Sequence, residues 1–168
     1  MSLSMYEASI PVFVRSLNNL SVILDKAVAN AEARKIDPSV FIQGRLAPDM
    51  HPLPRQIQIA TDGVKGAAAR LAGIEVPSFP DTETTFPELK ERIAKTVAFL
   101  QGINAEMIDG SEDRTITLKF PGNELSFTGK AFLLGFALPN LYFHVTAAYA
   151  ILRHNGVDVG KMDYLGRP

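Results

Sequence analysis

The sequence predicts an all-α protein: an antiparallel four-helix bundle that carries one short β-hairpin. Four segments place apolar residues three and four positions apart, which is the spacing of one face of a helix. A stretch after the third segment changes to strict alternation of apolar and polar residues, which is typical of a strand pair. Short and medium connections between the helical segments favour antiparallel neighbours.

The first helix is expected over residues 4–34. Ser4 and Glu7 have the spacing of a capping box, in which each residue bonds the backbone N–H of the other. Pro11 has no N–H, so we expect it to bend the helix near its start. The apolar stripe of this helix is Ile10, Phe13, Leu17, Leu20, Leu24, Val28 and Ala31.

The second and third helices are expected over residues 52–73 and 86–108. Two prolines open the second helix and Gly73 ends it, as is usual for proline at the start and glycine at the end of a helix. Thr85 and Glu88 have capping-box spacing at the start of the third.

The hairpin is expected in the connection between the third and fourth helices. Residues 115–120 and 124–128 alternate in polarity around a turn of proline, glycine and asparagine. An isolated hairpin is only marginally stable, so its apolar face should lie against the helices. The fourth helix is expected over residues 129–155, with a kink at Pro139, one turn before His144.

Size and composition limit the classes of protein that the chain can belong to. Its 168 residues are the usual length of one domain, so residues 1–168 are expected to form a single domain. Hydrophobic residues make up 46% and charged residues 21%, a balance that excludes intrinsic disorder. The chain has 17 basic and 18 acidic residues, and this lack of positive excess argues against nucleic acid as a partner.

Two absences bear on cellular location and chemistry. The chain has no cysteine, which excludes disulfides, thiolate metal sites and cysteine nucleophiles, and which is consistent with a reducing cytoplasm. The longest apolar stretch, residues 131–141, is shorter than the roughly 18 residues of a membrane span. We therefore expect a cytoplasmic protein with no membrane partner.

The candidate site residues are two of the three histidines. His51 lies at the start of the second helix and His144 lies inside the fourth. In an antiparallel bundle these positions can meet at one end, and imidazoles on facing helices are how bundles hold metal ions. Asp49, in the same loop as His51, could add a carboxylate. Structural alternatives stay open: His51 could cap its helix and His144 could be a hydrogen-bonded core residue.

The helices also carry apolar residues outside the four stripes. One bundle core cannot absorb all of them, so an isologous twofold dimer is expected to bury the rest. These positions include Val12, Val22, Ile59, Phe99 and Leu138.

Two segments, residues 45–57 (RLAPDMHPLPRQI) and 143–166 (FHVTAAYAILRHNGVDVGKMDYLG), carry a family resemblance. Together they resemble an uncharacterised family of the DinB/YfiT-like metalloenzyme superfamily, over residues 5–166. The resemblance implies a four-helix bundle that is often dimeric. It also implies that better-known relatives bind a divalent metal through three histidines, one on the second helix and two spaced four residues apart on the fourth.

This resemblance implies two functions for the chain. His51 and His144 match the first two ligand positions, but the third is occupied by Ala148. The first function is a divalent-metal-dependent enzyme of the thiol-transferase type, with zinc or nickel in an incomplete histidine site that Asp49 or water completes. Its partner would be a small-molecule substrate or a thiol. The alternative is a non-enzymatic dimeric bundle, ligand-binding or structural, that has lost the metal.

Overall fold

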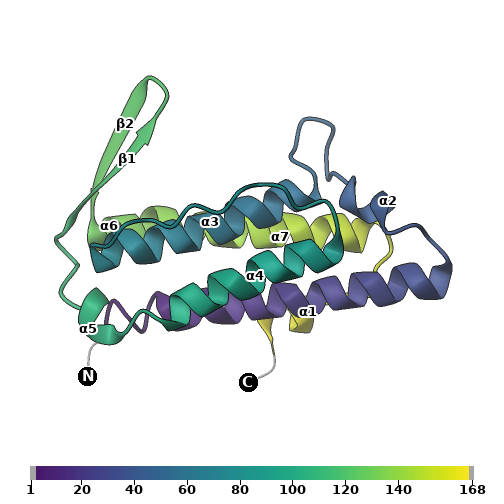
Figure 1. The fold of residues 1–168 in the computed structure, drawn as a ribbon, viewed down its shortest axis with the longest axis horizontal. Coiled ribbons are helices and arrows are strands. Elements are labelled where there is room, and N and C mark those ends of the chain that lie inside the picture. The colour runs from purple at the N-terminus through teal and green to yellow at the C-terminus, as the bar shows by residue number, and fades with distance from the viewer. Residues whose placement is uncertain (1–2, 167–168) are drawn as a thin grey trace.

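The computed structural model describes residues 3–166, and in this range the fold is mainly helical with one two-stranded antiparallel sheet (Figure 1). The long helices are α1 (Ile10–Arg34), α3 (Leu53–Ala72), α4 (Phe86–Gln101) and α7 (Leu138–His154), which we call the helical body. The short elements are α2 (Ser39–Ile42), α5 (Ala105–Ile108), α6 (Gly129–Phe132), the π-helical segment η1 (Leu133–Ala137) and α8 (Lys161–Leu165). The sheet consists of β1 (Thr115–Phe120) and β2 (Asn123–Thr128).

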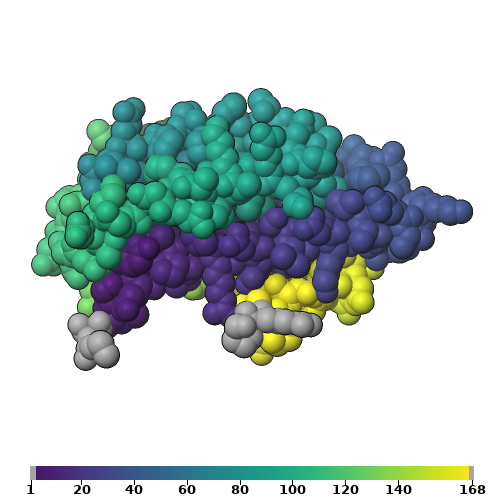
Figure 2. All heavy atoms as spheres, turned by 60° about the horizontal axis from the view of Figure 1, so that its bottom comes forward, coloured from purple at the N-terminus to yellow at the C-terminus, as the bar shows by residue number. Residues whose placement is uncertain are grey.

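The apolar stripes meet in the centre of the helical body. Helix α3 packs against α7 and α4, and α1 packs against α4 and α7. Figure 2 shows α1 lying between α4 and the C-terminal segment that contains α8. Leu17, Leu24 and Leu100 are fully buried, as their helical spacing predicts. Each such leucine contributes about 1.5–3 kcal/mol of apolar burial to the stability of the fold.

The first helix begins later than predicted. The capping-box contacts of Ser4 and Glu7 do form: the Ser4 N–H donates to Glu7 Oε2 at 3.1 Å, and the Glu7 N–H donates to Ser4 Oγ at 3.2 Å. Turns follow them, however, and α1 begins only at Ile10. Pro11 then stands in the first helical turn, where its missing N–H needs no partner. The proline therefore starts the helix instead of bending it.

The third helix is shorter than predicted. Helix α4 ends at Gln101, and a separate turn of helix, α5, follows. The side chain of Asn104 caps α5 by accepting a hydrogen bond from the Met107 N–H at 3.1 Å. An asparagine that satisfies a free N–H in this way begins a new helix, which is why the predicted span 86–108 is divided.

The fourth predicted helix contains a π-helical segment near Pro139. The chain runs through α6, η1 and α7 without leaving helical geometry, and Pro139 stands in the first turn of α7. The proline cannot donate to the carbonyl four residues before it, and the π-helical turns of η1 lie directly before α7. The sequence predicts a kink at this position, and the structure has a π-helical segment directly before it.

This apolar run bears on the expectation of no membrane partner. The helical run Gly129–His154 is long and apolar enough to cross a membrane by length and composition alone. In the structure 44% of its most apolar part is buried inside the protein. A core helix passes the same test, so the absence of a membrane partner stays a prediction.

The predicted hairpin forms and projects from the helical body (Figure 1). Strand β1 has the predicted bounds, and β2 begins at Asn123, one residue earlier than predicted. Gly122 has a φ of 77°, the left-handed region that the tight turn requires. The base of the apolar face is covered: Ile116 is buried, and the Phe127 ring lies 6.0 Å from that of Phe132. Leu125, nearer the tip, is exposed. The expectation that the helices cover the whole apolar face is therefore correct only at the base.

Candidate functional site

His144 and the start of α3 are joined by a buried glutamine. His144 on α7 is 9% exposed, and its Nδ1 lies 2.7 Å from Oε1 of Gln56, a buried residue in the first turns of α3. The other end of the Gln56 amide, Nε2, donates to the backbone carbonyl of His51 at 3.1 Å. Gln56 thereby connects the two predicted histidines, through the main chain of one and the ring of the other.

These two contacts determine which ring nitrogen of His144 carries the proton. Because the Gln56 amide nitrogen donates to a carbonyl, the amide oxygen must face the imidazole. An amide oxygen only accepts hydrogen bonds, so His144 Nδ1 carries the proton and Nε2 carries a lone pair. Within residues 3–166, no hydrogen bond to Nε2 is formed. Metal-binding histidines have this arrangement, with one ring nitrogen donating to an oxygen and the other open.

The environment keeps the His144 ring neutral. Burial lowers its pKa, and the nearby charges of His51 and Arg55 lower that pKa further. Both groups therefore lie within electrostatic range of the ring. His51 itself is exposed in the turn before α3. A neutral imidazole with an open nitrogen can accept a proton or bind a metal ion.

A complete three-ligand metal centre is not assembled in the described part of the chain. Within it, no group of three histidine, cysteine, aspartate or glutamate side chains is placed to hold a metal ion. Asp49 is exposed in the loop before His51, and Ala148 is fully buried one turn after His144. The His144 ring has one open nitrogen, and the exposed His51 ring lies within electrostatic range of it. His51, His144 and Asp49 remain predicted ligands.

An apolar groove lies next to His144 on the protein surface, and its lining includes the sequence neighbours of both histidines. Its volume is about 340 Å³, and it is lined by Leu46, Met50, Tyr142, Phe143, Thr146, Ala147 and Ala150. Met50 precedes His51, and the Phe143 ring meets the His144 ring edge-on with centroids 5.2 Å apart. An apolar part of a bound molecule could occupy this groove next to the imidazole of His144.

Gln56 is not among the residues that the sequence predicts for the site. Its signal is a polar residue beside Ile57, which follows Leu53 at helical spacing and is buried. A buried amide needs partners for its donors and its acceptor, so such a residue indicates a polar contact inside the protein. The third histidine, His154, lies exposed in the last turn of α7, where a cation interacts favourably with the helix dipole.

The fold defines the class of protein as DinB-like. The structure is similar to the crystal structure of a DinB family member protein from Shewanella denitrificans, with a TM-score of 0.88 and 45% sequence identity. The match covers 97% of this chain and 92% of that chain. Residues 5–165 match the domain of unknown function DUF1993, and the chain belongs to this family. A search of the curated proteins found no match. The resemblance inferred from the two sequence segments is confirmed.

Proposed function

We propose that this protein binds one divalent metal ion, zinc or nickel, through His144 Nε2 and the ring of His51, and that it acts as a DinB-like enzyme of the thiol-transferase type. The observation that carries this proposal is the contact between His144 Nδ1 and Gln56 Oε1, 2.7 Å long. It leaves Nε2 deprotonated and without a hydrogen-bond partner in residues 3–166. Gln56 also limits rotation of the ring, which favours ligation.

The remaining ligands of the metal ion would come from groups other than the two histidines. Asp49 or water would complete the coordination, because Ala148 has no donor atom. When bound, such a metal lowers the pKa of a coordinated thiol or water and so provides a nucleophile at neutral pH. The role of this chain's own residues is to hold His144 in one tautomer and to seat the apolar part of the substrate in the groove beside Phe143.

A second function is supported by a different observation. Ala148 is fully buried, and no three-residue donor group exists in the part of the chain that the structure describes. A two-ligand site binds metal weakly, since catalytic zinc usually has three protein ligands. This favours a non-enzymatic dimeric protein, structural or ligand-binding, in which the His144 pocket no longer holds a metal. The helical body would then present the groove to a ligand or to a second copy.

Metal titration of untagged protein separates the two functions. We expect isothermal titration with Zn²⁺ or Ni²⁺ to give one site per chain, and His144→Gln and His51→Gln each to weaken it by about tenfold or more. His154→Gln is the matched control, because it removes an exposed imidazole from the same helix as His144. Equal losses in all three variants, or no stoichiometric binding to the wild type, would favour the non-enzymatic function.

A further inference from the structure

The connection between α3 and α4 forms a strap that runs back along α3 (Figure 1). The strap comprises residues 74–84, and each of its residues is exposed or half-buried. It therefore adds no fully buried side chain to the core. Polar contacts and the half-buried side chains of Val76, Pro77 and Phe79 hold it in place, so that only partial apolar burial opposes its displacement.

The surface under the strap is polar. On α3 and α4 it presents the buried polar residues Gln58, Thr61, Lys65, Arg92 and Thr96. Lysine and arginine are almost never fully buried unless their charges are paired. We call this set the polar floor.

Arg92 is the centre of the polar floor. Its Nε donates to Thr61 Oγ1 at 2.8 Å, and its Nη2 lies 2.8 Å from Oδ2 of Asp62. Asp62 also pairs with Lys65 at 2.6 Å. Although Nη2 is buried beside carboxylates, it makes no well-aligned hydrogen bond within the described residues. The guanidinium therefore keeps a donor that a better-placed oxygen could use.

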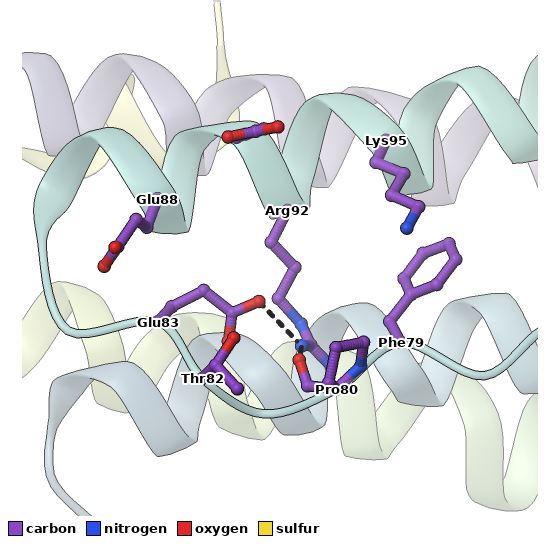
Figure 3. A pocket seen from close by; sticks show the side chains of 8 residues that line it. Phe79, Pro80, Thr82, Glu83, Glu88, Arg92 and Lys95 are labelled. Atoms are coloured by element: carbon purple, nitrogen blue, oxygen red, sulfur yellow. Dashed lines mark hydrogen bonds and ion pairs between the residues drawn. The ribbon is translucent and has the colours of Figure 1, made fainter.

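Two carboxylates of the strap lie against the same guanidinium. Arg92 Nη1 is 2.9 Å from Glu83 Oε1 and donates to the Pro80 carbonyl at 3.0 Å (Figure 3). Arg92 Nη2 is 3.0 Å from Asp81 Oδ1. Asp81 also pairs with Arg55, and Glu83 accepts a hydrogen bond from Gln58. Both strap carboxylates occupy positions that the oxygens of a small anion could take.

Phe79 separates two cavities under the strap. Its ring lies between two ammonium groups, with Lys65 Nζ 4.1 Å and Lys95 Nζ 4.2 Å from the ring centroid. A cavity of about 200 Å³ lies on the side of Arg92 and Lys95 (Figure 3), and one of about 360 Å³ lies on the side of Lys65 and Arg70. The space beside the cations is large enough for a small dianion.

The charges around these cavities balance only when the strap is in place. The positive side chains that line the cavities or pair with strap residues are Arg55, Lys65, Arg70, Arg92 and Lys95. The negative ones are Asp62, Asp81, Glu83, Glu88 and Glu91. If the strap moved away with Asp81 and Glu83, two positive charges would be left in excess. Such an excess favours an incoming anion.

We propose that the polar floor is an anion-binding site for a small dicarboxylate or a phosphate group, and that Asp81 and Glu83 occupy it in this conformation as substitutes for the ligand. The ligand exchanges with the strap: its oxygens replace the two carboxylates on Arg92, and the strap moves into solvent. This site is separate from the histidine site and needs no metal. Its test therefore does not depend on the metal proposal.

The test removes the competing carboxylates and measures anion binding. The variant carries Asp81→Asn and Glu83→Gln, and the probes are succinate and inorganic phosphate, with sodium chloride at equal ionic strength as the blank. The matched control carries Asp113→Asn and Glu124→Gln, which removes the same charge from exposed positions away from the strap. Isothermal titration should show one probe site in the strap variant, at least about tenfold tighter than in wild type or control.

A third substitution shows where the anion binds. Lys95→Gln, added to the strap variant, should weaken probe binding several-fold, and because Lys95 is exposed this change leaves the core intact. Binding of succinate alone would identify a carboxylate ligand, and binding of phosphate alone a phosphate ligand. Failure of both probes, or an equal gain in the control, would overturn the proposal. The rate of hydrogen exchange at the strap amides should rise when the probe binds the wild type. A slower rate would contradict displacement of the strap by the ligand.

Discussion

Substitution of Ala148 by histidine tests whether the histidine pocket can hold a metal ion. Ala148 is fully buried and lies one turn after His144 on the same face of α7. An imidazole at this position has to displace packed core atoms, and overpacking of this kind costs about 1–3 kcal/mol. Without metal, Ala148→His should therefore be less stable than the wild type by about that amount.

Zinc should reverse this loss if the pocket has the geometry of a metal site. A third nitrogen ligand should raise zinc affinity by orders of magnitude, since three protein ligands are usual for catalytic zinc. At a free zinc concentration 100 times the Kd, ligand linkage adds about 2.7 kcal/mol to the free energy of unfolding. For a domain of this size that is a rise in Tm of about 5–11 °C. The wild type should respond much less.

Thermal unfolding with and without zinc, combined with calorimetric titration, measures both effects. Ala150→His is the matched control: it places an imidazole on the same helix but in the groove wall, away from the His144 face. His51→Ala in the Ala148→His background should abolish the gain in affinity. If Ala148→His gains no metal, or gains no more than Ala150→His, the pocket is not a metal site and the enzymatic proposal is wrong.

Three further predictions concern stability and assembly. Leu24→Ala and Leu100→Ala should each lower the free energy of unfolding in urea by about 2–5 kcal/mol, because both side chains are fully buried; near-neutral values would contradict the core assignment. Burial lowers the pKa of His144 in the folded protein, so the unfolded chain takes up the proton at a higher pH. The free energy of unfolding should therefore be highest above a pH of about 6.5 and should fall below it. Urea titrations should show that the free energy of unfolding depends less on pH in His144→Gln than in the wild type, whereas His154→Gln should keep the wild-type dependence. Equal pH dependence in all three proteins would refute this assignment. Sedimentation at micromolar concentration should give twice the chain mass, and a strict monomer would exclude the dimer.

Local sequence signals predict the helices and the hairpin well where the residues that contact each other lie close together in the sequence. The third helix begins where its capping box places it: the Thr85 N–H donates to Glu88 Oε2 at 2.9 Å, and the Glu88 N–H lies 3.4 Å from Thr85 Oγ1. The strand pairing likewise follows from alternation, with Leu118 opposite Leu125. The turn between the strands has two residues, where the sequence predicts three. These signals depend on residues a few positions apart, and they can therefore be read from one sequence.

Features that depend on distant residues were not predicted. The Gln56–His144 contact joins residues 88 positions apart, and the Arg92–Thr61 contact joins residues 31 positions apart. No local pattern indicates which buried polar group will meet which partner, because that choice depends on how α3, α4 and α7 pack. The π-helical segment before Pro139 is a similar case: the proline predicts a disturbance of the helix but not the form that the disturbance takes.

The polar residues of α3 nevertheless carry a signal that an analysis of apolar stripes overlooks. Gln58, Thr61, Asp62 and Lys65 are spaced three and four residues apart, so they form a polar stripe on the side of the helix that the strap covers. Gln56 is two residues before Gln58, which at about 100° per residue places it on nearly the opposite side, toward His144. Helix α3 therefore presents polar groups to two separate places, the histidine pocket and the polar floor. Because different faces serve them, a substitution at Gln56 should weaken metal binding more than anion binding. A substitution at Asp81 should change anion binding more than metal binding, although Arg55, its partner, also lies within electrostatic range of His144.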